Sequence, residues 1–110
     1  MSRFAKVDRN HAAIVEAFRQ HPSVSVFSTA TLGGGVPDLI LGVDGWTVPV
    51  EVKVDKKKLN ALQQAWHQSW HGTPVVIVRT VDEANALVLN IRMARRVFSH
   101  PLLRAEEQTT

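Results

Sequence analysis

PDLILGVDGWTVPVEVK, residues 37–53, is the stretch that decides the fold. Asp44-Gly45, near its middle, is a typical two-residue turn between antiparallel strands. The flanking segments, Leu39–Leu41 and Trp46–Val54, are rich in apolar and β-branched residues, which favours strands. We therefore expect a β-hairpin here. Pro49 lacks a backbone N–H, so the sequence also predicts an edge position or a bulge at this residue.

Ahead of the hairpin, the sequence predicts a helix, a strand and a loop. Asp8 or Asn10 is a suitable N-cap for the helix, and Pro22 marks its end. Residues 24–26 alternate between valine and serine, as a half-buried strand does. Residues 29–35 finish in three glycines and are expected to form a loop. The helix is indicated by apolar residues at helical spacing, namely Ile14, Val15 and Phe18.

Beyond the hairpin, a helix, a strand and a last helix are expected. The helix covers Leu59–Trp70 and ends near Gly72, with Trp66 and Trp70 favoured as core or interface residues. Val75–Val78 is a continuous apolar run, expected to be a strand buried on both faces. Asp82 is expected to cap the last helix. The apolar faces of the two helices comprise Leu59, Leu62, Trp66 and Trp70, and then Ala84, Leu87 and Ile91.

The expected order is thus helix, three strands, helix, strand, helix. This order predicts an α/β domain with a small mixed sheet flanked by helices. We expect a single domain over residues 1–105, and a flexible tail over residues 106–110.

Composition narrows the range of functions. The chain has 110 residues, a net charge of +3, 45% hydrophobic residues and no cysteine. Without cysteine, disulfides, thiolate zinc sites and cysteine nucleophiles are excluded. No apolar run reaches the roughly 20 residues of a membrane span, and the first residues lack the apolar segment of a signal peptide. We therefore expect a cytoplasmic protein whose modest positive charge permits nucleic-acid binding.

Three residues of the hairpin suggest chemistry. Glu51 and Lys53 are two apart in a strand and project from one face, and hairpin pairing can bring Asp38 beside them. Two close carboxylates repel each other unless a cation lies between them, and carboxylate oxygens are ligands that Mg²⁺ prefers. Each residue alone also fits an ordinary surface or turn position. It is the combination of all three that favours a metal-assisted hydrolase.

Three segments together resemble the virus-type replication-repair nuclease domain, a branch of the PD-(D/E)xK superfamily found in phages and prophages. They are Gly33–Ile40, then Glu51-Val52-Lys53, then Leu59–His67, and Asn10-His11 ahead of Ile14 also looks like the opening of the family. The resemblance covers roughly residues 8–90. It implies a restriction-endonuclease-like fold and a metal-dependent DNA endonuclease.

Carried onto this chain, the resemblance implies a role for individual residues. Asp38 and Glu51 would bind Mg²⁺ or Mn²⁺ together with the Val52 carbonyl, and Lys53 would be the catalytic lysine. Gln63, in preference to the neighbouring Gln64, would be the glutamine that supports the site.

One position departs from the family pattern. Many relatives carry a glutamate on the first helix, where this chain has Ala13. Glu16, nearly one turn later, is a candidate replacement and a possible further metal ligand. An ordinary surface role for Glu16 is equally open. The alanine also supports the rival hypothesis, a DNA-binding or assembly module that keeps the nuclease fold without catalysis.

DNA contacts are expected from glycines and basic residues. Gly34 and Gly35 would let a DNA backbone approach the metal. The basic candidates are Lys56, Lys57 and Lys58 directly after the hairpin, with Arg92, Arg95 and Arg96 extending the same surface. His67 and His71 are four residues apart, but no third zinc ligand accompanies them. Stand-alone relatives resemble homodimeric junction resolvases, which implies a homodimer that acts on branched DNA and a phage- or prophage-encoded protein. Nicking or cleavage of a simple duplex stays open.

Overall fold

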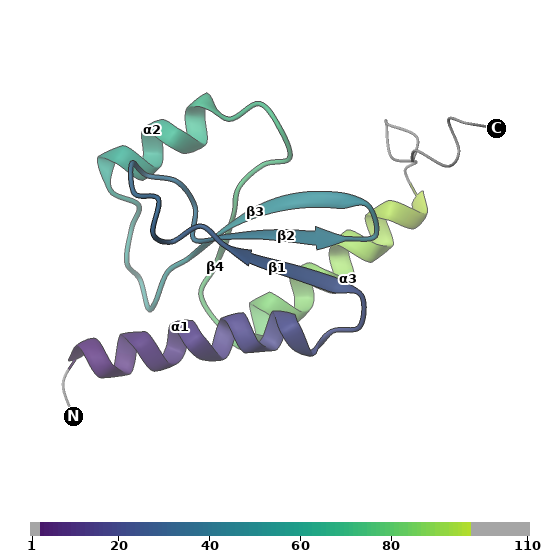
Figure 1. The fold of residues 1–110 in the computed structure, drawn as a ribbon, viewed down its shortest axis with the longest axis horizontal. Helices are drawn as coiled ribbons and strands as arrows, with labels where there is room; N and C mark the ends of the chain where they lie inside the picture. The colour runs from purple at the N-terminus through teal and green to yellow at the C-terminus, as the bar shows by residue number, and fades with distance from the viewer. Residues whose placement is uncertain (1–2, 98–110) are drawn as a thin grey trace.

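Within residues 3–97, which the computed structural model describes, seven helices and strands follow the order that the sequence predicts (Figure 1). Side chains are described from residue 9 onward. The result is a small α/β domain with a four-stranded mixed sheet and three helices. The elements are α1 (Arg3–Gln20), β1 (Val24–Ser28), β2 (Leu39–Val43), β3 (Trp46–Val52), α2 (Ala61–Ser69), β4 (Val76–Val78) and α3 (Val81–Val97).

The strands lie side by side in the order β1-β2-β3-β4, so their order in the sheet is the same as their order in the sequence. The β1–β2 and β2–β3 pairs are antiparallel, and β3–β4 is parallel. Asp44 and Gly45 form the predicted turn, with φ angles of 51° and 86°. Positive φ at both central residues is what this tight hairpin turn requires. The turn pairs Val43 with Trp46 and so sets the register as far as Leu39 and Val50.

The position predicted for Pro49 is wrong. Pro49 is buried in β3, an inner strand, where it pairs with Ile40 without a bulge in the register. Antiparallel pairs alternate between hydrogen-bonded and non-bonded, so, counting from the turn, the Pro49 nitrogen faces β4. The pairing between β3 and β4 begins only at Val50 and Val76. The donor that Pro49 lacks therefore falls just outside the ladder.

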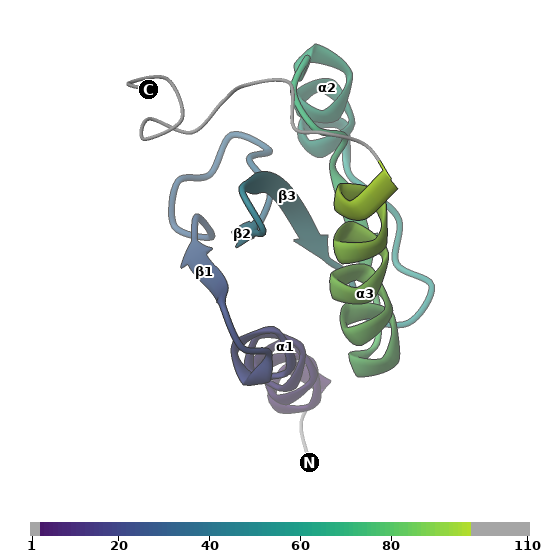
Figure 2. The ribbon, with the colours of Figure 1, turned by 90° about the vertical axis from the view of Figure 1, so that its right-hand side faces the viewer.

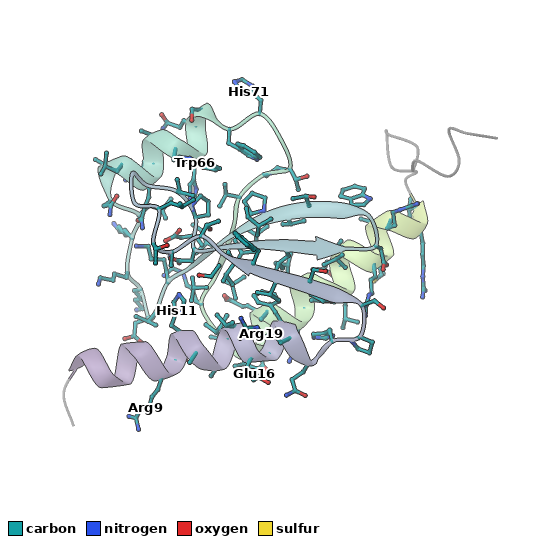
Figure 3. All side chains as sticks on the ribbon, viewed as in Figure 1. Arg9, His11, Glu16, Arg19, Trp66 and His71 are labelled. Atoms are coloured by element: carbon teal, nitrogen blue, oxygen red, sulfur yellow. The ribbon has the colours of Figure 1, made fainter. Side chains whose placement is uncertain are left out.

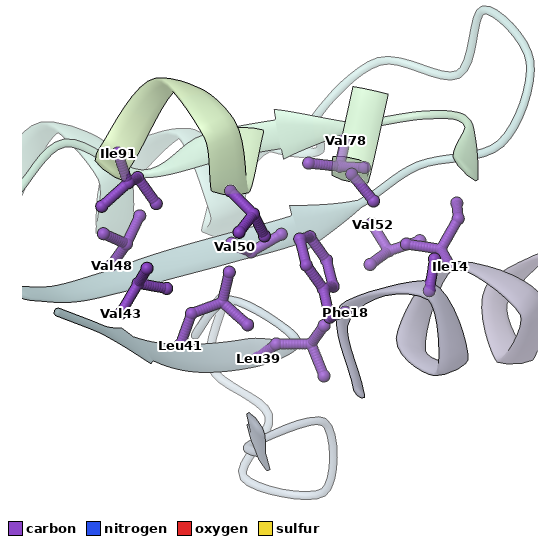
Figure 4. Packing of buried hydrophobic residues seen from close by; sticks show 13 residues of the cluster. Ile14, Phe18, Leu39, Leu41, Val43, Val48, Val50, Val52, Val78 and Ile91 are labelled. Atoms are coloured by element: carbon purple, nitrogen blue, oxygen red, sulfur yellow. The ribbon is translucent and has the colours of Figure 1, made fainter. Parts of the chain in front are cut away.

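One face of the sheet carries the core. Alternate residues of β2 and β3 point toward α1 and α3, whose inner faces they bury (Figure 4). Phe18 and Ile14 of α1 are fully buried there. Packing of this kind, rather than helix propensity, supplies most of the stability of such helices. The strand residues of this core are Leu39, Leu41, Val43, Val48, Val50, Val52 and Val78, and α3 adds Ala84, Val88 and Ile91.

The other face of the sheet is covered differently. In both views α2 lies on the opposite side of the sheet from α1 (Figures 1 and 2), and it has no buried residue. Leu62 is 63% exposed and Trp70 43%, and Trp70 stacks on Trp66 with ring centroids 4.9 Å apart. Trp66 and Trp70, favoured as core or interface residues, are therefore not part of the core of this chain, and an interface role stays a prediction. β4, predicted to be buried on both faces, has only Val78 buried because it lies at the edge of the sheet.

Two predicted helix starts are also wrong. α1 begins at Arg3, before Asp8 and Asn10. α3 begins at Val81, and its cap is Thr80, whose hydroxyl oxygen accepts from the Glu83 N–H at 3.1 Å. Asp82 lies inside the first turn instead. Of the expected single domain and its tail, residues 98–110 lie outside the described part of the chain.

Thr80→Ala is expected to lower the free energy of unfolding by about 1 kcal/mol, because the first turn of α3 loses its capping acceptor. Asp82→Ala is the matched control. It removes only a charge that interacts favourably with the helix dipole, at a cost of ~0.3–0.5 kcal/mol. Urea denaturation of both variants measures the difference. An equal or larger loss for Asp82→Ala would contradict the assignment of Thr80 as the cap.

No helix within residues 3–97 is both long and apolar enough to cross a membrane.

Candidate active site

The hairpin register brings Asp38 and Glu51 together. Leu39 pairs with Val50, so the next residues outward, Asp38 and Glu51, are neighbours at the end of the two strands. The Asp38 carboxylate accepts a hydrogen bond from the Val52 N–H at 2.8 Å. Lys53 directly follows β3, and its N–H donates to the Val78 carbonyl of β4 at 3.1 Å. The predicted juxtaposition of the two carboxyl groups is confirmed.

Thr29, which the sequence did not single out, fixes the turn that carries Asp38. Its side chain is buried, and its hydroxyl donates to the Pro37 carbonyl. Its N–H donates to the Asp38 carbonyl at 2.8 Å. Both bonds hold the backbone on either side of the Asp38 peptide, so the carboxylate is presented from a rigid support. Rigid supports of this kind are what precise functional sites need.

Gln63 reaches the site from α2. Its Nε2 donates to the Glu51 Oε1 at 2.9 Å, while its own Oε1 accepts from the Asn60 N–H at 3.0 Å. The Asn60 side chain accepts in turn from the Gln63 N–H, which completes a capping box at the start of α2. The cap therefore fixes the Gln63 side chain over Glu51. Gln64 instead donates to the Leu59 carbonyl, so Gln63 and not Gln64 is the glutamine that contacts Glu51.

His11 is the site residue that the sequence analysis missed. It extends from α1 toward the strands (Figure 3), and its Nε2 lies 3.8 Å from the Asp38 Oδ2. Glu16, the predicted replacement for the missing carboxylate, is exposed and accepts a hydrogen bond from Gln20 at 3.0 Å. Glu16 and Arg9 lie on the opposite side of α1 from His11 (Figure 3). The structure therefore brings an imidazole, and not Glu16, to the carboxylate pair.

The two carboxyl groups have divergent acidities. Burial together with the negative charge of Asp38 raises the pKa of Glu51 to about 7. Burial acts in the same direction on Asp38, but the contact with His11 and the Val52 N–H outweigh it and lower the pKa of Asp38. Between these two pKa values, the pair therefore holds one proton, on Glu51, and one negative charge, on Asp38. Interacting carboxyl groups commonly separate in this way.

The residues present fit a divalent cation. The Glu51 Oε2 is buried and has no hydrogen-bond partner, which is costly for a carboxylate unless a cation or a proton satisfies it. The residue opposite Val52 in the extended register is Pro37, which has no N–H to give to the Val52 carbonyl. Among the described residues, no three His, Cys, Asp or Glu side chains form a metal cage. A cation here would thus rely on the two carboxylates, this carbonyl, water and substrate oxygens, as Mg²⁺ commonly does.

The lysine loop, residues 54–58, leaves β3 next to the site. Lys56, Lys57 and Lys58 are exposed there, and their contact with DNA phosphates stays a prediction. Arg79 fixes the backbone of this loop, because its guanidinium donates to the carbonyls of Asp55 at 2.9 Å and Lys57 at 2.7 Å. The lysine ammonium groups are thereby presented on a defined backbone.

The arginines of α3 do not extend the lysine surface, so this prediction is wrong for Arg92 and Arg95. The Arg92 Nε lies 3.8 Å from the Asp44 Oδ2, and its guanidinium donates to the Pro22 carbonyl. Arg95 donates to the Asp44 carbonyl at 3.2 Å. Both therefore cap the turn of the hairpin, at the end of the sheet opposite to the site. Arg96 is exposed in the last turn of α3.

The glycine loop, residues 29–35, packs against α2 at Gly35. Gly34 is exposed with open space around it, as a flexible contact surface requires. Gly35 differs, since a Cβ there would lie 2.2 Å from the Leu62 carbonyl oxygen and 2.9 Å from the Gln63 nitrogen. Gly35 thus permits close approach to the helix that carries Gln63. The expected role of Gly35 in DNA approach is untested.

The two histidines of the α2 region differ sharply. His67 is half-buried, and its Nε2 is buried without a hydrogen-bond partner. Burial and the nearby Lys53 ammonium lower the pKa of His67, so its imidazole is neutral near pH 7. His71 is exposed and points away from the site (Figure 3).

No protein-family model matches the chain, and no curated protein is significantly similar to it.

Proposed function

We propose that this protein is a Mg²⁺- or Mn²⁺-dependent DNA endonuclease with a restriction-endonuclease-like core of the PD-(D/E)xK type. The observation that carries the proposal is the contact between the Asp38 and Glu51 carboxyl groups beside Lys53, with Gln63 hydrogen-bonded to Glu51. Four polar residues from three separate segments meet at one end of the sheet. A surface salt bridge would not need this convergence, whereas metal-assisted hydrolysis does.

Each residue of the site has a separate role in the proposed reaction. Asp38 and Glu51 would hold the cation through carboxylate oxygens, with the Val52 carbonyl as a further ligand. When bound, the divalent ion supplies Lewis-acid stabilisation of the phosphate and lowers the pKa of a water molecule. Gln63 keeps Glu51 oriented through its amide. Lys53, on the same face as Glu51, offsets negative charge that develops on the phosphate oxygens.

The proposed substrate is branched DNA bound by shape and backbone. The lysine loop carries three ammonium groups next to the site, which suits phosphate contacts. No element of the described residues presents the side chains of a base-reading helix, so positioning contacts dominate. Action as a homodimer would place two sites on two strands of a junction.

The decisive experiment measures cleavage of labelled four-way junctions and of linear duplexes in Mn²⁺, in Mg²⁺ and in EDTA. Wild type is expected to cleave only with metal, and Asp38→Ala and Lys53→Ala are expected to lose at least ~100-fold in rate. Asp82→Ala, which removes an exposed carboxylate from α3, is the matched control and should cleave as wild type does. Lys57→Ala is expected to weaken DNA binding and flatten its salt dependence, with the chemical step preserved.

Two outcomes would contradict the proposal. Equal cleavage by wild type, Asp38→Ala and Lys53→Ala would exclude the site. Metal-independent DNA binding without cleavage under any divalent ion would favour the rival function, a non-catalytic DNA-binding module with the same fold.

A further inference from the structure

We propose that Arg79 is a positioning residue for DNA binding: its guanidinium fixes the lysine loop, so that three ammonium groups meet DNA phosphates as a preformed array. The inference rests on the proposed function, because it concerns the DNA that this function binds. Arginine beside a nucleic-acid surface commonly contacts phosphate itself. The hydrogen bonds of the Arg79 guanidinium go instead to the backbone of the loop.

A single nitrogen of Arg79 joins two points of the loop. Its Nη1 donates to the Asp55 carbonyl at 2.9 Å and to the Lys57 carbonyl at 2.7 Å, which uses both hydrogens of that nitrogen. The Lys57 N–H in turn donates to the Val54 carbonyl at 3.2 Å. Asp55 has a φ of 51°, a left-handed conformation that few residues other than glycine, asparagine and aspartate adopt. The loop is therefore a closed turn built around the guanidinium.

Arg79 is itself anchored to the core. Its N–H donates to the Glu83 Oε1 at 2.7 Å, and Glu83 lies in the first turn of α3, whose inner face packs on the sheet. The residue before it, Val78, is buried and accepts from the Lys53 N–H at 3.1 Å. The end of β4 thus holds both the backbone of Lys53 and that of the lysine loop. A phosphate bound by the loop would therefore lie at a fixed offset from the proposed reaction site.

The charges of this region favour a polyanion as the ligand. The Arg79 guanidinium donates to neutral carbonyls, so its positive charge adds to those of the three exposed lysines, against the one carboxylate of the loop, Asp55. Neighbouring cations repel one another, and an unrestrained loop would relax by moving them apart. The two bonds from Arg79 limit this relaxation. A loop that is ordered before DNA arrives loses less conformational entropy on binding, which raises the affinity.

Relaxation of ¹⁵N in the backbone amides tests the grip in the free protein. We expect order parameters of ~0.85 for residues 56–58 in wild type, and values below ~0.6 in Arg79→Met. Methionine keeps an aliphatic side chain of similar shape in this half-buried position but removes every donor. A loop that is mobile in wild type, or that stays rigid in Arg79→Met, would overturn the proposal. The wild-type measurement holds even if the variant folds poorly.

Binding of a labelled four-way junction in EDTA, followed by fluorescence anisotropy, supplies the second test. Arg79→Met is expected to raise Kd by ~10-fold. Arg19→Met, which removes the same charge from the exposed end of α1, is the matched control and should bind as wild type does.

A double-mutant cycle separates positioning from direct contact. Its background variant carries glutamine in place of Lys56, Lys57 and Lys58. In that background Arg79→Met should raise Kd no further, because no ammonium groups remain to be positioned. A rise of ~10-fold that persists there would assign Arg79 to direct phosphate contact and overturn the proposal.

Kinetics distinguish the failure of this inference from that of the proposed function. Arg79→Met is expected to raise KM for the junction by ~10-fold and to leave kcat unchanged, since Val78 still holds the Lys53 backbone. A loss of kcat instead would show that Arg79 supports the whole site and not the loop, which contradicts the inference. If wild type cleaves and Arg79→Met binds and cleaves equally well, the inference fails while the nuclease function stands. If wild type binds without cleaving and Arg79→Met binds more weakly, the nuclease function fails while the inference stands. A wild type that does not bind DNA defeats both.

Discussion

Glu51→Gln is expected to make the metal-free protein more stable at pH 8 while abolishing its stabilisation by Mn²⁺ and its cleavage of DNA. The cause is the pKa of about 7, against an ordinary value of 4.5. Because the folded-state pKa is raised, the charged form destabilises the fold. This cost is absent below pH 4.5, grows as the pH rises toward 7, and is complete above it. At 1.36 kcal/mol per pKa unit, its upper limit is ~3 kcal/mol.

The amide is nearly isosteric with the protonated carboxyl group that it replaces. Its oxygen still accepts from Gln63, and its N–H can donate to Asp38, so the fold is retained. Thermal unfolding at pH 4 and pH 8, with and without Mn²⁺, measures the effect. Wild type at pH 8 should gain ~3 kcal/mol at 100 times the dissociation constant of the metal, and the variant should gain none. Glu16→Gln, on the exposed side of α1, is the control with the same chemical change. A variant destabilised at pH 8, or stabilised by Mn²⁺ as wild type is, would refute the expectation.

The same pKa sets the pH dependence of metal binding. Since metal ligands must be deprotonated, Mn²⁺ has to displace the Glu51 proton below pH 7. Affinity should therefore rise as the pH increases from 6 to 8, with close to one proton released per ion at the lower pH. Calorimetry in buffers of different ionisation enthalpy measures that proton.

Gly35→Ala is expected to separate Gln63 from Glu51 and to slow cleavage by ~10–100-fold. With φ at 85°, an added Cβ lies 2.2 Å from the Leu62 carbonyl oxygen and 2.5 Å from its carbon. Both atoms are backbone, so no side-chain rotation relieves the collision. Either the glycine loop or the start of α2 must move, and α2 has no buried residue to resist the movement.

Gly33→Ala provides the matched control for this change. Gly33 has a φ of 68°, so alanine there carries the same left-handed backbone penalty of ~1–2 kcal/mol. Its Cβ meets no atom within 4 Å, so the contact with α2 is preserved. We expect similar losses of backbone stability in both variants, measured by urea denaturation, but slow cleavage only in Gly35→Ala. Equal cleavage rates in the two variants would show that the contact with α2 is unimportant.

The sequence was a good guide wherever the decisive interaction is local. Asp44-Gly45 sets the turn, the turn sets the register, and the register places Asp38 beside Glu51. Each of these steps involves residues that are close in the chain, or joined by one tight hairpin. Gln63 was singled out by the resemblance to the nuclease domain and not by a local pattern, although the capping box that holds its side chain involves only neighbouring residues.

Prediction failed where distant segments decide. His11 lies on the same face of α1 as Ile14 and Phe18, the face that the apolar spacing predicts to be buried, whereas Glu16 lies off that face. What the sequence does not show is that this face meets the end of β2 at Asp38. Arg92 and Arg95 looked like DNA-binding residues because their charge is visible in the sequence, whereas their partners at Asp44 and Pro22 are not. The apolar spacing of α2 was a poor guide for a related reason, since Gln63 and His67 are half-buried beside Trp66 while the apolar Leu62 and Trp70 are exposed.

The absence of buried residues on α2 divides the site between two cooperative units. Asp38 and Glu51 belong to the sheet that carries the core. Only global unfolding exposes them fully to solvent, and this costs the full free energy of unfolding. Gln63 and His67 belong to a helix that can detach by a sub-global opening at a fraction of that cost. Amide hydrogens of α2 should accordingly exchange with solvent well before those of β2 and β3. The carboxylate pair then keeps its geometry during openings in which α2 carries Gln63 and His67 away from the site.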